Sequence, residues 1–569
     1  MKGGSQMKTL RKILVACISI AVVTSSGMAL AKRASHTEAG MATIAGTVQD
    51  VRLLSVILNG STPSTIPEYF TLPDQTGGIA TYQPGGPTST SGNGFFSTHI
   101  TTNGRSCFTC HQAQNGWSLS PPAIAAQFRS TKGRSALFQP IDAANCPTSP
   151  GATDLRHLRR FVAVRSQLFR HGNFRISLNA PNPLGPRDST YMTFDGNTNP
   201  EWVLVSLYDP FNCEQDPVHG LPANLLSVYR RPLPSTNVAF LAQDGAPNKF
   251  DIMWDAREQN LRTQFINATL FHGQTTVVPD DTSITQGVQF QAGMFTGQRL
   301  DWVARDLTGG DGSGALGGPI NLWDWRQTVS PLCATGLSGE LVCNGVKEKL
   351  TLPDGQRVNN SSQLFDAFAT PVGYSPMKRA RRESIARGEA IFKTKVFTIN
   401  FIAGFNDIKG DADGTEPGTC SSCHSNKNVG NDTAHDPKRL GIGDNSTGVS
   451  VLPMKPDFPR FAFYCPTGSI PFFSNPVTSS SCPGSTPGNN ATCDKFITTD
   501  PGKGLTNGKC EDLGKMKVPV LRGLASRAPY FHGGNSATLE DLVDFYNNRF
   551  NIGFSDQEKQ DLVNYMNSL

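Results

Sequence analysis

The sequence predicts a mainly α-helical protein made of two similar helical domains, with loop-rich and small β insertions. A five-residue motif, C-x-x-C-H, occurs at residues 107–111 and again at residues 420–424, and this repetition indicates two related units. Before the second copy, residues 383–392 carry apolar side chains at helical spacing. Near the end of the chain, Ser555 and Glu558 form a capping box that opens another helix. Helix, motif and terminal helix together predict a compact helical unit around the motif.

Composition and charge exclude several classes of protein. Of the 569 residues 37% are hydrophobic and 17% are charged, while Gly (56) and Pro (39) are abundant, which is typical of a loop-rich exported protein. The formal net charge is +5, but four lysines and arginines lie in the first 31 residues, so the remainder carries only +1. This balance excludes a strongly basic nucleic-acid-binding protein. After residue 31 no apolar run is long enough for a membrane span, so we expect none.

The first 31 residues are typical of a signal peptide. Basic residues precede an apolar run at residues 13–23, and residues 29–31 (ALA) provide a small-x-small cleavage site. We therefore expect export to the periplasm. The mature chain is expected to divide near residue 375, into an N-terminal domain at residues 32–375 and a C-terminal domain at residues 376–569.

The cysteine count fits an oxidising compartment. The chain has thirteen cysteines, of which one lies in the expected leader and four lie in the two motifs. An even remainder of eight in an exported protein predicts up to four disulfides. We expect Cys333 and Cys343 to pair locally, and the last four to pair among themselves. The eight are Cys146, Cys213, Cys333, Cys343, Cys465, Cys482, Cys493 and Cys510.

The segments around the first motif are expected to be irregular or β-rich. Residues 60–105 are rich in Gly, Ser, Thr and Pro, which predicts a loop or an irregular collar. Residues 174–178 and 202–207 are typical of strands. We therefore expect a small β insertion bracketed by Cys146 and Cys213.

The motif C-x-x-C-H is the attachment signature of c-type haem. Two thiols on one helical turn reach the two vinyl groups, and the adjacent histidine binds the iron. A zinc site or a thioredoxin-like redox pair competes with this interpretation, but neither requires histidine directly after the second cysteine. The sequence thus predicts two covalent haem c groups in cytochrome c-like domains. The attachment residues are Cys107, Cys110, Cys420 and Cys423, with His111 and His424 as iron ligands.

Several further segments resemble one family. Residues 519–523 (PVLRG), 527–535 (RAPYFHGGN) and 538–541 (TLED) resemble the P-x-L-R … A-P-Y-F-H-x-G-S … T-L-E signature of the bacterial di-haem cytochrome c peroxidase and MauG superfamily. Residues 254–264 (WDAREQNLRTQ) are similar to its W-D-G-R-A-x-x-L-x-x-Q segment, and residues 231–235 (RPLPS) to its R-N-x-P-T segment. The resemblance covers most of the mature chain. It implies a first haem that reacts with peroxide and a second that stores and passes electrons.

The resemblance also implies roles for single residues. Trp254 matches the tryptophan that lies between the two haems and relays electrons, and Gln264 matches the distal glutamine over the first haem. Ten residues later the family places a catalytic glutamate, but Gln274 stands here and cannot carry a proton. His272 could substitute, because an imidazole titrates near neutrality, or it could be a structural histidine.

The sixth ligand of the second haem has two candidates. The peroxidases place a methionine, and the MauG-like enzymes a tyrosine, at the position that is Tyr546 in this sequence. Related rubber oxygenases use a histidine close to the position of His532. A tyrosinate or histidine ligand lowers the iron potential relative to methionine and favours high oxidation states. The sequence leaves both residues open.

A calcium ion lies between the two haems in the family, bound by the Asn of R-N-x-P-T and by carbonyls near A-P-Y-F-H. In this sequence the Asn position is Pro232, which has no side-chain oxygen, whereas the carbonyls of Arg527 and Pro529 remain available. Calcium takes roughly six to eight oxygen ligands. The resemblance therefore implies a Ca²⁺ site that lacks one of its ligands here.

Taken together, the resemblance implies a periplasmic di-haem c-type oxidoreductase that depends on peroxide. It would act as a cytochrome c peroxidase or, like MauG, oxidise a partner protein. Hydrogen peroxide or dioxygen would be the oxidant, and a small periplasmic cytochrome c or cupredoxin the electron donor. Two alternatives remain. A non-enzymatic electron-transfer cytochrome is expected if both irons are six-coordinate, and a dioxygenase resembling the rubber oxygenases if a wide apolar channel reaches the first haem.

Overall fold

The computed structural model describes most of the chain after residue 47. The expected signal peptide, residues 1–31, lies outside the described part. Among the described helices, none combines the length and the apolar character that a membrane span requires. The described residues are 48–179, 200–213, 225–243, 246–329, 333–335, 341–343, 364–409, 414–425, 429–431, 436–446 and 452–569.

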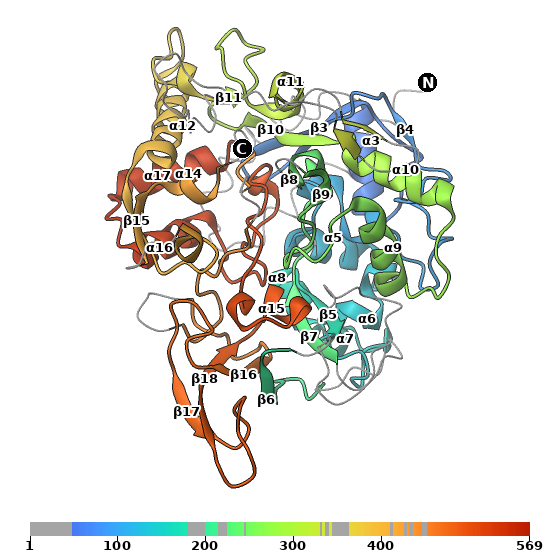
Figure 1. Ribbon diagram of the computed structural model, residues 1–569. Coiled ribbons are helices and arrows are strands. Elements are labelled where there is room, and N and C mark those ends of the chain that lie inside the picture. Colours follow the sequence, from blue (N-terminus) through green and yellow to red (C-terminus); the bar gives the residue numbers. More distant parts are fainter. Residues whose placement is uncertain are drawn as a thin grey trace.

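The N-terminal part of the fold contains a four-stranded antiparallel sheet with the order β11-β10-β3-β2 (Figure 1). Its strands are β2 (Tyr69–Pro73), β3 (Gly77–Tyr82), β10 (Phe295–Asp301) and β11 (Arg305–Asp306). Phe70 and Leu72 of β2 are buried in a core that also takes residues from α3 (Val48–Leu58) and from the first motif. The sheet therefore packs against the segment that carries the first C-x-x-C-H motif.

The expectation of an irregular loop over residues 60–105 is wrong for residues 69–82, which form the hairpin β2–β3. In the turn of this hairpin, Asp74 Oδ1 accepts hydrogen bonds from the backbone N–H groups of Thr76 and Gly77 at 2.8 and 2.7 Å. The Gly- and Thr-rich composition is typical of a loop and does not indicate strands. The strand conformation of β3 also depends on its second partner, β10, which lies far along the chain.

The first motif forms α4 (Cys107–Cys110), and other helices surround it. They are η1 (Ala113–Asn115), α5 (Pro121–Thr131), α6 (Pro140–Ala143), α7 (Leu158–Ala163), α8 (Ser166–His171), α9 (Leu261–His272) and α10 (Asp281–Ala292). Trp117 is fully buried, and its ring centroid lies 5.4 Å from that of Phe290 and 6.1 Å from that of Phe108 in α4. Its indole Nε1–H donates to Thr81 Oγ1 of β3 at 2.9 Å. Trp117 thus joins the sheet to the motif.

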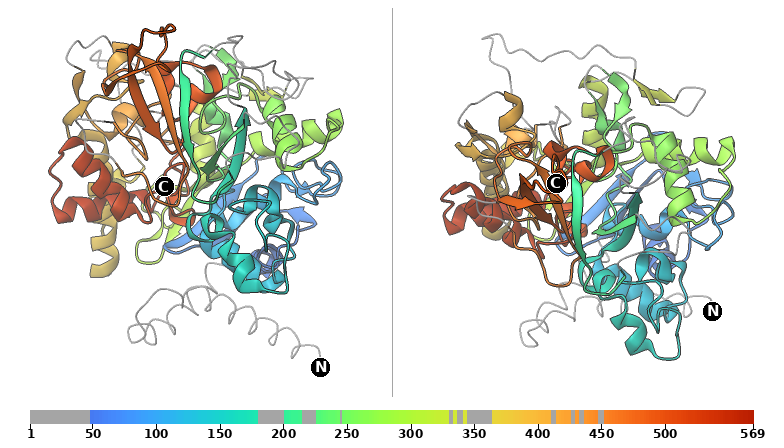
Figure 2. Two further views of the ribbon diagram at one scale, coloured as in Figure 1. Left: turned by 90° about the horizontal axis from the view of Figure 1, so that it is seen from below. Right: turned by 60° about the horizontal axis from the view of Figure 1, so that its bottom comes forward.

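The two predicted strands of the β insertion are present, but they belong to different sheets. β5 (Phe174–Asn179) pairs with β7 (Leu225–Arg230). β6 (Val203–Tyr208) joins β16 (Arg460–Pro466), which continues through β18 (Ala491–Thr498) to β17 (Pro476–Ser479). In Figure 2 the orange strands of this sheet lie beside β6. The sheet therefore combines strands from both sides of residue 376.

Three disulfides hold these β segments. Cys146 pairs with Cys213 at an S–S distance of 2.13 Å. Two further disulfides join Cys465 to Cys510 and Cys482 to Cys493. They confirm the prediction that the last four cysteines pair among themselves. For Cys333 and Cys343 the backbone register of β12 (Cys333–Thr335) with β13 (Leu341–Cys343) sets the two residues opposite one another. Their side chains lie outside the described part of the structure.

The second motif lies among the C-terminal helices, which gather on one side of the molecule in Figure 1. They are α12 (Pro376–Thr394), α14 (Cys420–Cys423), α16 (Leu539–Phe550) and α17 (Asp556–Met566). The predicted helix over residues 383–392 lies inside α12. The predicted capping box opens α17: the Ser555 N–H donates to Glu558 Oε2 at 2.8 Å, and the Glu558 N–H donates to Ser555 Oγ at 3.3 Å. Both predictions are confirmed.

Helices α12 and α17 pack closely at Gly388, where a Cβ atom would lie 2.0 Å from the Asp561 carbonyl oxygen. The other described elements are short. They are β1 (Thr65–Ile66), β4 (Thr88–Ser89), η2 (Ala136–Phe138), η4 (Val238–Leu241), β8 (Ala242–Gln243), β9 (Ala246–Phe250), α11 (Gly318–Val329), η5 (Asp366–Phe368), β14 (Phe397–Asn400), α13 (Asn406–Lys409), β15 (Thr415–Gly418), α15 (Lys503–Asn507), η6 (Cys510–Asp512) and η7 (Leu524–Ser526).

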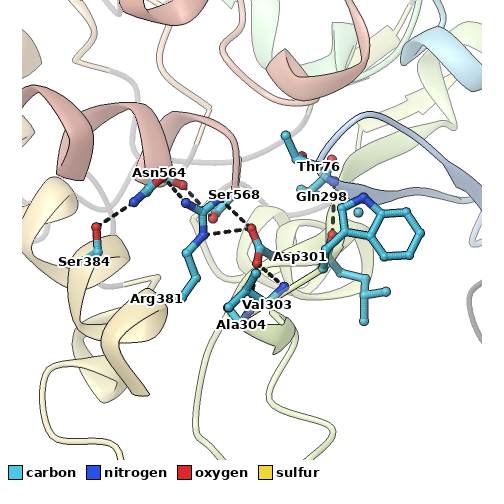
Figure 3. Close-up of polar contacts among 12 residues, drawn as sticks. Thr76, Gln298, Asp301, Val303, Ala304, Arg381, Ser384, Asn564 and Ser568 are labelled. Atoms are coloured by element: carbon cyan, nitrogen blue, oxygen red, sulfur yellow. Dashed lines mark hydrogen bonds and ion pairs between the residues drawn. The ribbon is translucent and has the colours of Figure 1, made fainter. Parts of the chain in front are cut away.

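Arg381 of α12 connects the N-terminal sheet to the C-terminal helices (Figure 3). Its Nη2 group donates to Asp301 Oδ2 at the end of β10 at 2.8 Å, and its Nη1 group donates to Asn564 Oδ1 of α17. Asp301 Oδ1 accepts the backbone N–H groups of Val303 and Ala304, both at 2.7 Å. The Asp301 side chain is only 3% exposed, so it depends on these donors.

We predict that Arg381→Met lowers the free energy of unfolding by about 3 kcal/mol, because a buried carboxylate would lose its charge partner. Arg379→Met is the matched control, since Arg379 is exposed on the same helix and forms no ion pair among the described residues. Chemical denaturation of both variants measures the difference. Equal stability of the two would contradict the role given to Asp301 and Arg381.

Candidate functional site

Both C-x-x-C-H motifs form one helical turn of the same design. In α4 the backbone N–H of Ser106 donates to Thr109 Oγ1, and in α14 the N–H of Thr419 donates to Ser422 Oγ, both at 3.0 Å. Each motif histidine then donates its backbone N–H to the carbonyl of the first cysteine, at 3.0 and 3.1 Å. A single turn brings the two thiols to one side, which is the arrangement that covalent haem attachment needs.

The ring of each motif histidine is held by a backbone carbonyl six residues later. His111 Nδ1 lies 3.1 Å from the Trp117 carbonyl oxygen, and His424 Nδ1 lies 2.6 Å from that of Gly430. With Nδ1–H donating, Nε2 is the unprotonated nitrogen, and it is suited to bind a metal. Burial lowers the pKa of His111 to about 4, which keeps the imidazole neutral.

The thiols are unlike those of a dithiol redox enzyme. Burial raises the pKa of Cys107, Cys110 and Cys420 to about 12. Redox-active cysteines need a lowered pKa, because the thiolate is the nucleophile. Within the described ranges, no group of three or more His, Cys, Asp and Glu side chains is placed to hold a metal ion. The raised pKa of these thiols disfavours the competing thioredoxin-like interpretation.

A cavity that opens to solvent adjoins the first motif. It contains about 1360 Å³ of space free of atoms, a volume that includes open solvent. Cys107, Cys110 and His111 line it. The two thiols, the oriented imidazole and the adjoining space fit a covalently attached haem with His111 as its iron ligand.

One face of α9 also lines this cavity. Gln264 and His272 are eight residues apart, so two helical turns separate them on the same face. Ala268 lies between them on that face, and its small methyl side chain leaves the space open. The structure thus brings both predicted residues to the cavity of the first motif.

His272 is oriented by a buried aspartate. Its Nδ1 lies 2.9 Å from Asp142 Oδ2, and the same oxygen accepts a hydrogen bond from Arg105 Nη1 at 2.9 Å. The side chains of Asp142 and Arg105 are each 3% exposed. The Arg105 guanidinium is itself fixed by four backbone carbonyls, those of Ala136, Gln139, Ile141 and His272. With Nδ1 engaged, the Nε2 atom of His272 is the nitrogen that remains for chemistry in the cavity.

Asp142 and Arg105 were not found from the sequence. Asp142 lies 130 residues before His272, so no spacing pattern connects them. It also has a φ of 61°, in a region that disfavours most residues, within the short helix α6. A single sequence gives no signal for this contact.

Gln274 is not among the residues that line the cavity. Helix α9 ends at His272, and Gln274 follows with a φ of 56°. Its Oε1 accepts a hydrogen bond from Asn103 Nδ2 at 3.3 Å. Gln274, at the position of the family's catalytic glutamate, therefore does not reach the cavity, whereas His272, the candidate for proton transfer, does.

Trp254 lines the cavity and contacts His532. Its indole Nε1–H donates to the Arg231 carbonyl at 2.8 Å, and its ring centroid lies 6.2 Å from that of His532 in an edge-to-face arrangement. The Arg231 backbone N–H in turn donates to the His532 carbonyl at 2.8 Å. Burial lowers the pKa of His532 to about 4, so this imidazole is neutral.

Tyr546 of α16 lies beside the second motif. It packs in an apolar cluster that includes Cys423, and its ring stacks with Phe550 at a centroid distance of 6.2 Å. Burial raises the pKa of Tyr546, and the nearby Cys423 and Cys420 raise it further. Of the two candidates for a sixth ligand, the structure thus brings Tyr546 to the motif cysteines and His532 to Trp254.

The residues at the expected calcium position do not fit a cation. The Arg231 guanidinium donates hydrogen bonds to the Pro529 carbonyl, to the Leu119 carbonyl at 2.7 Å, and to the Ala528 carbonyl at 3.4 Å. A positive group therefore already contacts the Pro529 oxygen that calcium would use. Together with the missing Asn at Pro232, this contact argues against a Ca²⁺ site here.

Comparison with known proteins gives partial similarities. No protein-family model matches the chain. The similarity is to cytochrome-c peroxidases. Cytochrome-c peroxidase IdrP1 of Denitromonas iodatirespirans is 34% identical over 70 residues, which is 10% of this chain and 19% of that protein. IdrP2 of the same organism is 36% identical over 78 residues, or 12% and 21% of the two chains.

A third relative, cytochrome-c peroxidase IdrP1 of Pseudomonas sp. (strain SCT), is 36% identical over 70 residues, or 10% of this chain and 18% of that protein. The chain thus covers about a fifth of the length of these relatives. At a coarse level the similarities support a peroxidase-like oxidoreductase with haem c as cofactor.

We predict that the mass of the isolated protein exceeds that of its polypeptide by two haems. Cys107→Ala/Cys110→Ala and Cys420→Ala/Cys423→Ala should each lose one haem, because each pair would provide the thioether bonds for a separate group. Cys482→Ala/Cys493→Ala removes a disulfide outside the motifs and should keep both. Intact-protein mass spectrometry would contradict the assignment if the wild type carried fewer than two.

Proposed function

We propose that the protein is a periplasmic di-haem c-type oxidoreductase of the peroxidase type, with two cytochrome c-like domains. The observation that carries the proposal is that Gln264 and His272 line the cavity formed beside Cys107, Cys110 and His111. Polar groups on one helix face can act on a small oxidant bound in that cavity. The partial similarity to cytochrome-c peroxidases supports the same class of reaction.

A haem attached at Cys107 and Cys110 would supply oxidant binding and electron transfer at the first site. The protein residues provide the proton chemistry and the orientation. The Gln264 amide can donate a hydrogen bond to bound hydrogen peroxide. His272 Nε2 can accept a proton from one peroxide oxygen and return it to the leaving oxygen, as a general base and then a general acid. Asp142 holds the imidazole in the tautomer that this transfer requires.

The second site is proposed to store and pass electrons. Tyr546 packs with Cys423 and is the proposed sixth ligand. As an oxygen ligand it would lower the iron potential and favour high oxidation states. Trp254 is the proposed relay between the two sites, with His532 packed against its ring. A tyrosine at this position favours oxidation of a partner protein, as in MauG-like enzymes, over simple reduction of peroxide by a small donor protein.

A second candidate function has one observation in its favour. Apolar side chains, among them Phe174, Leu241 and Phe265, also line the cavity of the first motif. An apolar substrate could therefore approach the first site, as in the alternative of a dioxygenase. Consumption of dioxygen by the reduced protein, dependent on an added hydrocarbon, would favour that alternative over a peroxidase.

The proposal predicts the effect of removing the histidine. His272→Ala should lower the second-order rate constant for the reaction with hydrogen peroxide by about 100-fold or more, because general acid–base catalysis is lost. His157→Ala is the matched control: His157 also pairs with an aspartate, Asp154, but lies on the surface with 70% of its side chain exposed. Stopped-flow spectroscopy measures both rate constants. Equal rate constants for the two variants would contradict the role of His272.

A further inference from the structure

Positive charge gathers on the surface where the end of α5 meets α7. Residues 129–160 contain six lysines and arginines and two aspartates, a net charge of +4, whereas the whole chain after residue 31 carries only +1. The rest of that chain is therefore net negative. All six cationic residues are exposed, and together they are called the basic face: Arg129, Lys132, Arg134, Arg156, Arg159 and Arg160.

The two segments that carry these charges pack against one another, so the charges share one surface. The rings of Phe128 in α5 and Phe161 in α7 are stacked at a centroid distance of 6.0 Å. At Gly133, between Lys132 and Arg134, a Cβ atom would lie 3.0 Å from Phe161 Cε1. In the right-hand view of Figure 2 the cyan segment, which includes α7 and α8, lies at the lower edge of the molecule.

Acidic side chains neutralise little of the basic face. Arg156 Nε lies 3.2 Å from Asp154 Oδ1, and His157 pairs with the same aspartate. The other aspartate of the segment, Asp142, is buried and pairs with Arg105. The remaining five cations of the face form no ion pair among the described residues. Exposed like charges repel one another, and an acidic surface placed over them relieves that repulsion.

The composition of the basic face fits a protein partner that presents carboxylates. Five of its six cations are arginines, whose planar guanidinium can bind a carboxylate through two parallel hydrogen bonds. Leu155 is 36% exposed and adds an apolar contact beside Gly133. A membrane-binding surface inserts a broader apolar stripe, and Leu155 is the one large apolar side chain exposed within residues 129–160, all of which the structure describes.

One cluster of apolar side chains separates the basic face from the first motif. Phe161 of α7 lies in this cluster with Phe174, and Phe128 and Cys110 pack against it. Cys110 and Phe174 also line the cavity of the first motif. A protein that docks on the basic face would therefore lie close to the first motif, with only this packed layer between them.

We propose that the basic face is the docking surface of an acidic redox protein, which the first site oxidises. This inference rests on the haem and the peroxide reaction proposed for that site. Two partner molecules each lose one electron. The two electrons, together with two protons, reduce one hydrogen peroxide to two water molecules.

The test uses the full-length holoprotein and an acidic cupredoxin as the probe. Arg134→Glu/Arg159→Glu reverses two charges of the basic face. Arg379→Glu/Lys509→Glu is the matched control, because it changes the net charge equally at two exposed side chains after residue 376. The association rate constant with immobilised cupredoxin, measured by surface plasmon resonance at low salt, should fall by about 10-fold or more in the face variant. The control should remain close to the wild type.

Equal association rate constants for the face variant and the control would overturn the proposal. Binding of the wild type to vesicles of anionic phospholipid, without association with the cupredoxin, would also overturn it, because the face would then recognise a lipid surface. Arg134→Lys/Arg159→Lys keeps the charge and should keep the fast association. If the glutamate variant does not accumulate, Arg134→Gln/Arg159→Gln carries the same prediction with a smaller decrease.

Peroxide turnover separates this inference from the proposed function. With reduced cupredoxin as the electron donor, kcat/KM should fall in the face variant, whereas with hydroquinone, a small uncharged donor, it should equal that of the wild type. An equal loss with both donors would overturn the docking role. A wild type that turns over peroxide with neither donor would contradict the proposed function, while the association rate constants would still test the acidic partner.

Discussion

The hydrogen bond between His111 Nδ1 and the Trp117 carbonyl is the interaction on which the first site depends. It fixes the ring of the motif histidine and leaves Nε2 for the metal. The same carbonyl accepts the backbone N–H of Ser235 at 2.9 Å, and Ser235 lies in the cavity wall. Trp117 in turn is anchored to Thr81 of β3. A sheet at some distance from the cavity thus helps to determine the orientation of the proposed iron ligand.

The two motifs share one local design but lie in different surroundings. The first adjoins a cavity with polar groups on α9, whereas the second packs beside the aromatic residues Tyr546 and Phe550. Since the turns themselves are nearly the same, the proposed difference in function has to come from residues that distant elements supply. An open site for a small oxidant and a site closed by the protein are the two outcomes that these surroundings favour.

The features that depend on local interactions could be predicted from local patterns in the sequence. The two motif turns, the helix over residues 383–392, the capping box at Ser555 and the pairing of the last four cysteines were all predicted, because each depends on close spacing or on parity. Gln264 could be named from its place in a resembling segment, and His272 from its place two residues before Gln274. That they share one helix face follows from their separation of eight residues.

Contacts between distant segments could not be predicted. The hairpin β2–β3 has the composition of a loop, and its strand conformation depends on pairing with β10. Asp142 orients His272 across 130 residues, and the Arg231 side chain reaches the Pro529 carbonyl across 298. Such contacts depend on tertiary packing, which one sequence does not display.

Electron paramagnetic resonance of the isolated ferric protein, before and after one equivalent of hydrogen peroxide, tests most directly whether the first site is open and the second closed. We predict one high-spin and one low-spin haem, with the high-spin signal changing on addition of peroxide. Two low-spin haems that ignore peroxide, even after half-reduction, would contradict it and leave an electron-transfer cytochrome.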